Sequence, residues 1–250
     1  MYEETARFQD KHWYLVGMRE IVMELFGRND NRSWKILDLG CGTGQYLPLL
    51  SRQGKVVGLD RATEALSLIA RNGSLNPVLV RGDAQRLPFR DRSFDLVWAS
   101  SILEHLPEDG AGLQEAVRVL KTEGRMVISV PAHHFLWGHQ DELVHHLRRY
   151  SREDFESLCG RCGLKIIRIT NYGSTLLPLA FLVRKAKNFL GRISPRVKEI
   201  SDFRLADFPA FNNLLLSVLR LEKLGLVRLD LPFGLMLFAL VEKDIPGPEK

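Results

Sequence analysis

The most chemically informative stretch of the sequence is a glycine-rich loop after a short apolar segment. Gly40, Gly42 and Gly44 alternate with other residues in DLGCGTG, which begins at Asp38. Such glycines permit a tight turn and let a ligand approach the backbone, because no Cβ intervenes. The third glycine comes one residue early for the dinucleotide pattern G-x-G-x-x-G, and no G-K-[ST] follows as in a P-loop. The spacing suits a ligand with a compact sulfonium and an amino-acid tail.

Two acidic residues end the next two apolar segments. Asp60 stands 20 residues after Gly40, where a carboxylate can accept hydrogen bonds from both hydroxyls of a ribose. Asp60 could instead cap a helix that starts near Ala62. Asp83, followed by Ala84, is positioned to meet an adenine amino group, although GDA could also form a simple turn.

Most of the histidines fall where proton transfer would be useful. An oxygen or nitrogen nucleophile needs a nearby general base to remove its proton. Glu104 and His105 directly follow the fourth apolar segment and are candidates, as are His133 and His139 after the fifth; a helix cap or a supporting role is the alternative. The six histidines in these positions are His105, His133, His134, His139, His145 and His146.

The segment WGHQDELVHHLRRYS (137–151) concentrates aromatic, acidic, histidine and arginine residues. It could form a lid over an acceptor site, with His139, Asp141 or His145 abstracting a proton. The alternative is a polar network in which Asp141 pairs with Arg149. The histidines offer metal-ligand types, but neither H-E-x-x-H nor a carboxylate cluster is present, so we expect no metal.

The elements that must position these residues alternate between apolar runs and amphipathic stretches. Short runs rich in Val, Ile and Leu are typical of parallel strands that are buried on both faces. Strands that alternate with helices predict a doubly wound, mostly parallel α/β sheet with right-handed crossovers. The expected strands are 35–40, 55–60, 77–83, 94–100, 125–131, 164–170 and 233–243, and the expected helices are 45–53, 63–72, 112–121, 151–163 and 213–224.

Taken together, LDLGCGTG, Asp60, GDAQRLPF, SFDLVWASSILEHLPE and RVLKTEGRMVISVP resemble class I S-adenosylmethionine-dependent methyltransferases of the type-11 kind. The resemblance covers roughly residues 30–170. It implies a Rossmann-like sheet of seven strands, mostly parallel with an antiparallel last strand, and S-adenosyl-L-methionine as cofactor. The implied cofactor contacts are Asp38, Gly40, Gly42 and Gly44 around the methionine, Asp60 and Arg61 at the ribose, Asp83 and Ala84 at the adenine, and Ser100 on the carboxylate side.

The chain is expected to form a single methyltransferase domain over residues 1–250, with a helical cap in 1–34 and a helical insertion in 171–231. The whole chain has 35 Lys+Arg against 30 Asp+Glu. The insertion contains ten of the basic residues and five of the acidic ones, so it carries the entire net charge of +5. The charge therefore points to the insertion as an acceptor cap.

Within the insertion, residues 176–198 combine an apolar stretch with a basic one. Such a pattern is typical of a helix at an anionic membrane surface, but also of a packed cap with solvated lysines. Stacking aromatics are few, so we expect no nucleic-acid partner. The longest uncharged stretches, 171–183 and 231–241, fall short of the ~18 residues that span a bilayer.

The expected location is the cytoplasm, with or without contact to the membrane surface. No signal peptide is visible at the N-terminus. The three cysteines fit a reducing compartment, and Cys159 and Cys162 are interpreted as helix-end thiols rather than a redox pair.

The expected reaction is methyl transfer to a small or lipophilic acceptor through oxygen. A sulfonium is an activated donor, so positioning contributes most of the catalysis. The alternatives are a protein or RNA acceptor, and a non-catalytic subunit that binds the cofactor.

Overall fold

The computed structural model describes residues 2–27, 34–72, 77–193, 208–226 and 228–244. In the helix that ends at residue 193, side chains are described up to residue 186. The last part of the 176–198 segment therefore lies outside the described residues, as do parts of the expected 1–34 cap and 171–231 insertion.

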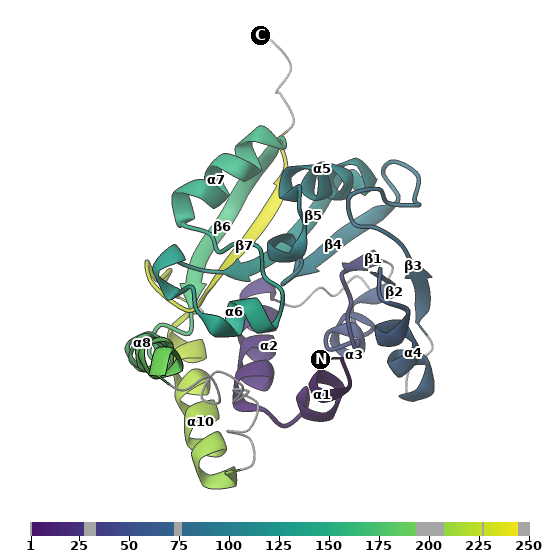
Figure 1. The fold of residues 1–250 in the computed structure, drawn as a ribbon. Coiled ribbons are helices and arrows are strands. Elements are labelled where there is room, and N and C mark those ends of the chain that lie inside the picture. Colours follow the sequence, from purple (N-terminus) through teal and green to yellow (C-terminus); the bar gives the residue numbers. More distant parts are fainter. Residues whose placement is uncertain (1, 28–33, 73–76, 194–207, 227, 245–250) are drawn as a thin grey trace.

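A seven-stranded sheet in the order β3-β2-β1-β4-β5-β7-β6 forms the centre of the molecule (Figure 1). Its strands from β1 to β5 run parallel, and β7 pairs antiparallel with both β5 and β6. This confirms the fold class expected from the sequence. The strands are β1 Trp34–Leu39, β2 Gly54–Asp60, β3 Val78–Arg81, β4 Phe94–Ser100, β5 Leu120–Pro131, β6 Leu164–Tyr172 and β7 Met236–Lys243.

The chain order reverses beside β1, which is hydrogen-bonded to β2 on one side and to β4 on the other. Asp38, near the end of β1, is in register with Gly58 of β2 and Trp98 of β4. In open α/β sheets ligands bind outside the carboxyl ends of the strands at such a switch point. The glycine loop starts there.

Helices cover both faces of the sheet because its strands alternate between two hydrophobic clusters. Leu37 and Leu39 of β1 belong to the cluster of α5 and α7, whereas Ile36 belongs to the cluster of α2, α3, α4 and α10. Successive side chains of a strand point to opposite faces, which explains the division. The helices are α2 Trp13–Phe26, α3 Leu47–Leu50, α4 Thr63–Asn72, α5 Asp109–Val119, α7 Arg152–Arg161 and α10 Pro209–Leu226.

The sequence predicts the ends of some helices better than the ends of others. Ser151 caps α7 as predicted, since its Oγ accepts a hydrogen bond from the Asp154 N–H. The predicted helix over 45–53 is limited to α3, and the residues after it form turns. The predicted helix over 112–121 is wrong at both ends, because α5 starts at Asp109 and Leu120 already begins β5.

Among the described residues, the connection from β6 to β7 contains the helices α8 (Leu177–Ile193) and α10. Glu222 of α10 accepts backbone N–H groups from Gly173, Ser174 and Thr175, which fixes the turn after β6. Asn212 of the same helix binds the Trp13 N–H and the Lys11 carbonyl, so α10 packs along α2. Among the described helices, none is long and apolar enough to cross a membrane.

Candidate functional site

The glycine loop has the conformation that its spacing predicted. The φ angles of Gly40, Gly42 and Gly44 are +73°, +51° and +84°, a region that favours glycine. A Cβ on Gly40 would collide with Ile102, whereas a Cβ on Gly42 would meet no atom within 4 Å. Gly42 therefore faces open space, in which a ligand could approach the backbone.

Asp38 is a buried carboxylate at the start of this loop. Only 3% of the residue is exposed, and its Oδ2 has no hydrogen-bond partner among the described residues. Burial, together with the nearby charge of Asp60, raises the pKa of Asp38 to about 8. An ionised carboxylate without a partner is costly in such a place. A cationic group in the loop would remove that cost.

Asp60, at the end of β2, joins the loop to the next helix. Its Oδ2 accepts the Gly42 N–H and its Oδ1 accepts the Ala62 N–H, both at 2.9 Å. These bonds fix the turn that leads into α4, which starts at Thr63. Each oxygen keeps a second lone pair, so the ribose contact remains a prediction. The side chain of Arg61 is exposed, and its carbonyl accepts a bond from Arg81 Nε.

The remaining predicted cofactor residues also follow strand ends. Asp83 is exposed and its Oδ1 accepts the Gln85 N–H in a turn, while Ala84 is buried. The Ser100 hydroxyl donates to the Tyr46 hydroxyl at 3.2 Å. Their contacts to adenine and carboxylate remain predictions.

The N-terminal helix contributes to this site in a way that the sequence did not reveal. Gln9, just after α1 (Tyr2–Phe8), accepts a hydrogen bond from the Thr43 hydroxyl of the glycine loop at 2.7 Å. Burial raises the pKa of the Tyr2 hydroxyl, and so does the charge of Asp60. No pattern in 1–12 links these residues to the loop, because the contact depends on how α1 packs beside α4 (Figure 1).

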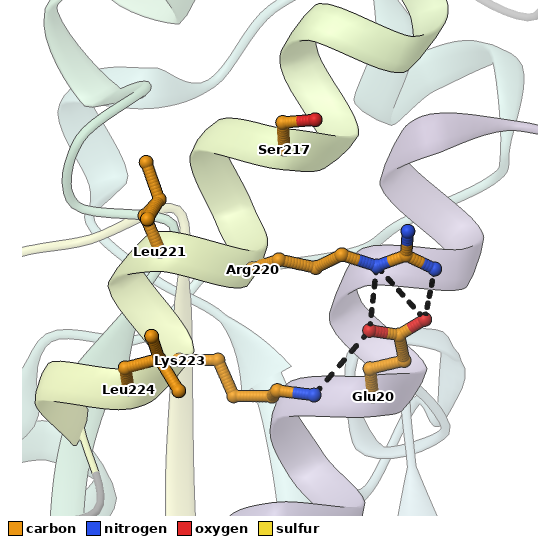
Figure 2. Close-up of a pocket in the computed structure, with 6 residues that line it drawn as sticks. All are labelled: Glu20, Ser217, Arg220, Leu221, Lys223 and Leu224. Atoms are coloured by element: carbon orange, nitrogen blue, oxygen red, sulfur yellow. Dashed lines mark hydrogen bonds and ion pairs between the residues drawn. The ribbon is translucent and has the colours of Figure 1, made fainter.

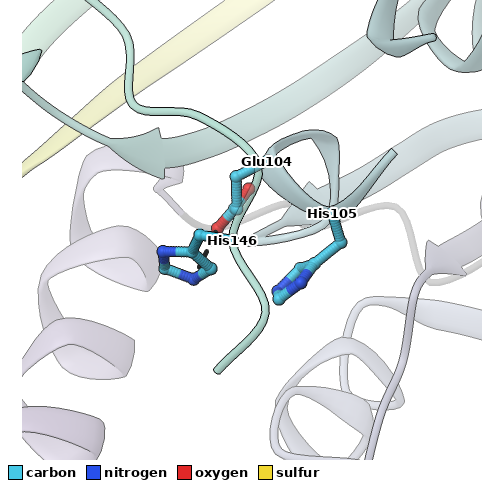
Figure 3. Close-up of side chains that lie close together, drawn as sticks. All are labelled: Glu104, His105 and His146. Atoms are coloured by element: carbon cyan, nitrogen blue, oxygen red, sulfur yellow. Dashed lines mark ion pairs between the residues drawn. The ribbon is translucent and has the colours of Figure 1, made fainter. Parts of the chain in front are cut away.

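Beyond β4, two predicted catalytic residues meet a third from a distant segment. Glu104 and His105 lie in the 3-10 helix η1 (Leu103–His105), and His146 approaches them from the loop after α6 (His139–Leu143) (Figure 3). The Nε2 atom of His146 is 3.9 Å from Glu104 Oε1, and the two histidine rings are 4.9 Å apart in an edge-on arrangement.

The protonation of these residues follows from their burial. Glu104 is 0% exposed, and burial raises its pKa to about 7 although the charge of His146 opposes the shift. Burial and His146 lower the pKa of His105 to about 4, so its imidazole is neutral at pH 7. A neutral imidazole offers a lone pair to a proton or a metal ion.

Asp141 is the centre of a polar network, as one alternative for segment 137–151 predicted. Its Oδ1 accepts hydrogen bonds from Arg149 Nε at 2.8 Å and from His146 Nδ1 at 2.9 Å, and its Oδ2 pairs with Arg184 at 3.1 Å. Burial alone would raise the pKa of Asp141, but the bonds from His146 and Arg149 hold it well below its usual range. These contacts hold the Asp141 carboxylate in place between the two arginines and His146.

The other two predicted catalytic histidines have contacts elsewhere. His133 stacks on Phe135, and its Nε2 lies 3.4 Å from Asn171 Nδ2. His139 pairs with Glu142 one helical turn away, at 3.0 Å. A catalytic role for either residue remains a prediction, and the structure groups Glu104 and His105 with His146 instead.

Two further features lie outside this region. Cys159 and Cys162 are buried free thiols at the end of α7, and burial raises the pKa of Cys159 to about 12. An open depression of about 660 Å³ lies between α2 and α10, where Glu20 pairs with Arg220 and Lys223 (Figure 2). Its lining contains no residue of the glycine loop or of the predicted strand-end contacts.

The sheet order, the antiparallel β7 and the glycine loop at the switch point define a Rossmann-like methyltransferase fold. Residues 37–128 match the family model described as a methyltransferase domain. Residues 37–128 are thus similar to a methyltransferase domain, and they lie within a Rossmann-like methyltransferase fold.

The curated relatives match over part of their length. The chain is 39% identical over 101 residues to the demethylmenaquinone methyltransferase of Lactiplantibacillus plantarum, a match that covers 37% of this chain and 43% of that protein. The chain spans about half the length, or less, of the curated relatives it matches.

Solved structures share the fold at low sequence identity. An S-adenosylmethionine-dependent methyltransferase from Mesorhizobium loti superposes with a TM-score of 0.57 and 16% identity, covering 94% of this chain and 99% of that one. The [4+2]-cyclase SpnF gives a TM-score of 0.59 and 19% identity, covering 91% of this chain and 80% of that one. Since a cyclase shares the architecture, the fold does not define the reaction.

Proposed function

We propose that the chain transfers a methyl group from S-adenosylmethionine to an oxygen atom of a small lipophilic acceptor. The observation that supports the donor assignment is the buried Asp38 carboxylate, whose Oδ2 has no hydrogen-bond partner among the described residues, together with the open space at Gly42. A cationic ligand without phosphates fits a loop that offers a buried carboxylate and open space at Gly42 but no G-K-[ST].

The residues that would hold the donor come from three strand ends. Asp38 and the loop glycines would hold the methionine part, Asp60 the ribose, and Asp83 the adenine. When bound, the sulfonium supplies an activated methyl group. The chain's own contribution is to orient the acceptor and exclude water, because positioning accounts for much of the rate of such a displacement.

An apolar acceptor is supported by the surface beside this site. On α8, Leu179 and Val183 are a little over 40% exposed, at 44% and 42%, and Leu182 is 64% exposed. Phe135, after β5, contacts Phe181 of α8 with ring centroids 6.0 Å apart. The similarity to a demethylmenaquinone methyltransferase agrees with a lipophilic acceptor. A protein or RNA acceptor finds no comparable support.

The sequence that begins in α8 and continues past its end supports contact with an anionic membrane surface. Residues 184–198 contain six basic residues and no acidic one, directly after the exposed apolar side chains of α8. Arg184 pairs with Asp141 and Lys185 lies over the Phe181 ring, so part of this charge also fixes the helix to the domain. Apolar contact and basic charge together favour binding to anionic lipid.

Two measurements test the function. Calorimetry with S-adenosylmethionine should show binding that Asp60→Ala weakens, because Gly42 and Ala62 also lose their hydrogen-bond acceptor. Incubation of lipid extracts with donor labelled in the methyl group should then yield a labelled lipophilic product. Donor binding without any labelled product from lipid, protein or RNA would favour the non-catalytic alternative.

Membrane contact has its own test. The protein should float with vesicles that contain anionic lipid at low salt and dissociate at high salt, since screening weakens the attraction. Leu182→Gln should reduce flotation, whereas Val78→Gln, an equally exposed apolar change on β3, should not. Equal flotation of both variants would contradict the assignment to α8.

A further inference from the structure

The Glu104 side chain is the least satisfied polar group in the described part of the chain. It is 0% exposed, and neither of its carboxylate oxygens has a hydrogen-bond partner among the described residues. Buried carboxylates are normally paired, hydrogen-bonded or bound to a metal. The nearest histidine nitrogen, His146 Nε2, is 3.9 Å from Oε1, which is beyond hydrogen-bond distance, so the carboxylate can still accept a cation.

The two histidines beside Glu104 are each oriented by a hydrogen bond at the Nδ1 atom of the ring. His105 Nδ1 lies 3.2 Å from the His145 carbonyl oxygen, and His146 Nδ1 lies 2.9 Å from Asp141 Oδ1. Both partners accept hydrogen bonds, so each Nδ1 is the donor, and Nε2 is the ring nitrogen left to bind a metal ion. Metal-binding histidines characteristically donate their second N–H to a carboxylate or a carbonyl in this way.

We propose that Glu104, His105 and His146 bind a divalent transition-metal ion such as Zn²⁺ (Figure 3). Their ligand atoms all lie within 4.8 Å of one another, and His146 Nε2 is 3.9 Å from Glu104 Oε1. In a tetrahedral zinc site with bonds of about 2.0–2.1 Å, ligand atoms lie about 3.3 Å apart, so small side-chain movements complete the site. Two imidazoles and one carboxylate suit zinc and neighbouring metals better than magnesium.

The surrounding backbone holds these three side chains in place. The Leu147 N–H donates to the Glu104 carbonyl at 2.8 Å, and the His146 N–H donates to the Asp141 carbonyl at 2.8 Å. Arg149 and Arg184 fix the Asp141 carboxylate in turn. The three side chains are therefore already close together without an ion, and the proposed site departs from the expectation that the chain holds no metal.

Three protein ligands leave at least one coordination position open, as in catalytic metal sites. The cluster also adjoins the donor side, because Ile102, two residues before Glu104, packs against Gly40. If the proposed function holds, on which this step rests, the acceptor hydroxyl would bind at the open coordination position. The ion would favour loss of the hydroxyl proton to water. As the oxygen forms its bond to the methyl carbon, the carbon–sulfur electron pair returns to sulfur and leaves a neutral thioether.

The metal site can be tested without any methyl transfer. The chelator-treated full chain is titrated with Co²⁺, whose visible absorption reports nitrogen and oxygen coordination, and with Zn²⁺ in competition. We expect one ion per chain in the wild type. Glu104→Gln and His146→Asn should each weaken binding by about 100-fold or more, because loss of a ligand exceeds the 10–100-fold effect of outer-shell changes.

His134→Asn is the matched control, since His134 is exposed and pairs with Asp154 away from the cluster. Circular dichroism of each variant checks that the fold is retained. The proposal is overturned if the wild type binds no ion, or if the control loses binding as much as the cluster variants. Donor calorimetry on the metal-free chain is independent, so failure of the metal site and failure of the proposed function are distinguishable.

Discussion

The buried Asp38 carboxylate leads us to predict that protein stability falls and donor binding strengthens as the pH rises. The folded pKa of Asp38 is about 8 and its ordinary value is 3.8. At 1.36 kcal/mol per pKa unit, ionising Asp38 in the folded state costs about 6 kcal/mol more than in the unfolded chain, as an upper bound. Because the folded pKa is raised, the folded protein keeps its full stability below pH 4, where Asp38 is protonated in both states. Its free energy of unfolding falls as the pH rises to 8, because the unfolded chain ionises first.

The perturbation is Asp38→Asn, which keeps the shape of the side chain and removes its charge. Urea unfolding at several pH values between 5 and 8 gives the free energy of unfolding of both proteins. The wild type should lose stability relative to the variant by about 1.4 kcal/mol per pH unit at most. Asp244→Asn, an exposed carboxylate at the end of β7, is the control and should show little of this trend.

Donor binding should respond with the opposite sign. A cationic ligand favours ionised Asp38, so binding at pH 7 should release a proton and strengthen as the pH rises. Asp38→Asn should weaken binding by roughly 10–100-fold, the effect of about 1.5–3 kcal/mol for a hydrogen bond to a charged group. A stability difference that does not change with pH, or full donor binding by the variant, would refute the reasoning.

Three further substitutions test other parts of the structure. Gly42→Val should cost about 1–2 kcal/mol of stability because of the positive φ at this position. The valine side chain would also occupy the open space at Gly42, so calorimetry should show a loss of donor binding larger than 1–2 kcal/mol. Asp141→Ala should lower the free energy of unfolding by about 3–5 kcal/mol, because Arg149 then stays buried without its partner; an unchanged urea midpoint would contradict the network. Ser151→Ala should cost about 1 kcal/mol through loss of the α7 cap, and Ser157→Ala, in the exposed middle of the same helix, should cost much less.

The sequence predicted the features that depend on local pattern. The apolar runs that contain Asp38 and Asp60 predicted the parallel strands β1 and β2, and Ser151 predicted the start of α7. The error at Leu120 has a physical cause: its spacing from Leu113 and Ala116 fits one helix face, but tertiary pairing draws Leu120 opposite Phe94 of β4.

The contacts that the sequence could not predict join residues far apart in the chain. His146 reaches Glu104 across 42 positions, because the Leu147 N–H binds the Glu104 carbonyl. The Gln9 side chain likewise binds a residue far away in the sequence, since it accepts a hydrogen bond from the Thr43 hydroxyl, 34 positions later. Neither pair has a local periodicity, since both depend on how separate loops meet at one edge of the sheet.

The attachment of α1 has a consequence for the kinetics of the donor site. Helix α1 contains no buried residue, yet Gln9 just after it binds the glycine loop through Thr43. Elements with few buried contacts open locally at low free-energy cost. We therefore expect amide hydrogens of α1 to exchange much faster than those of β1, and donor to enter and leave by detachment of this helix while the sheet stays intact.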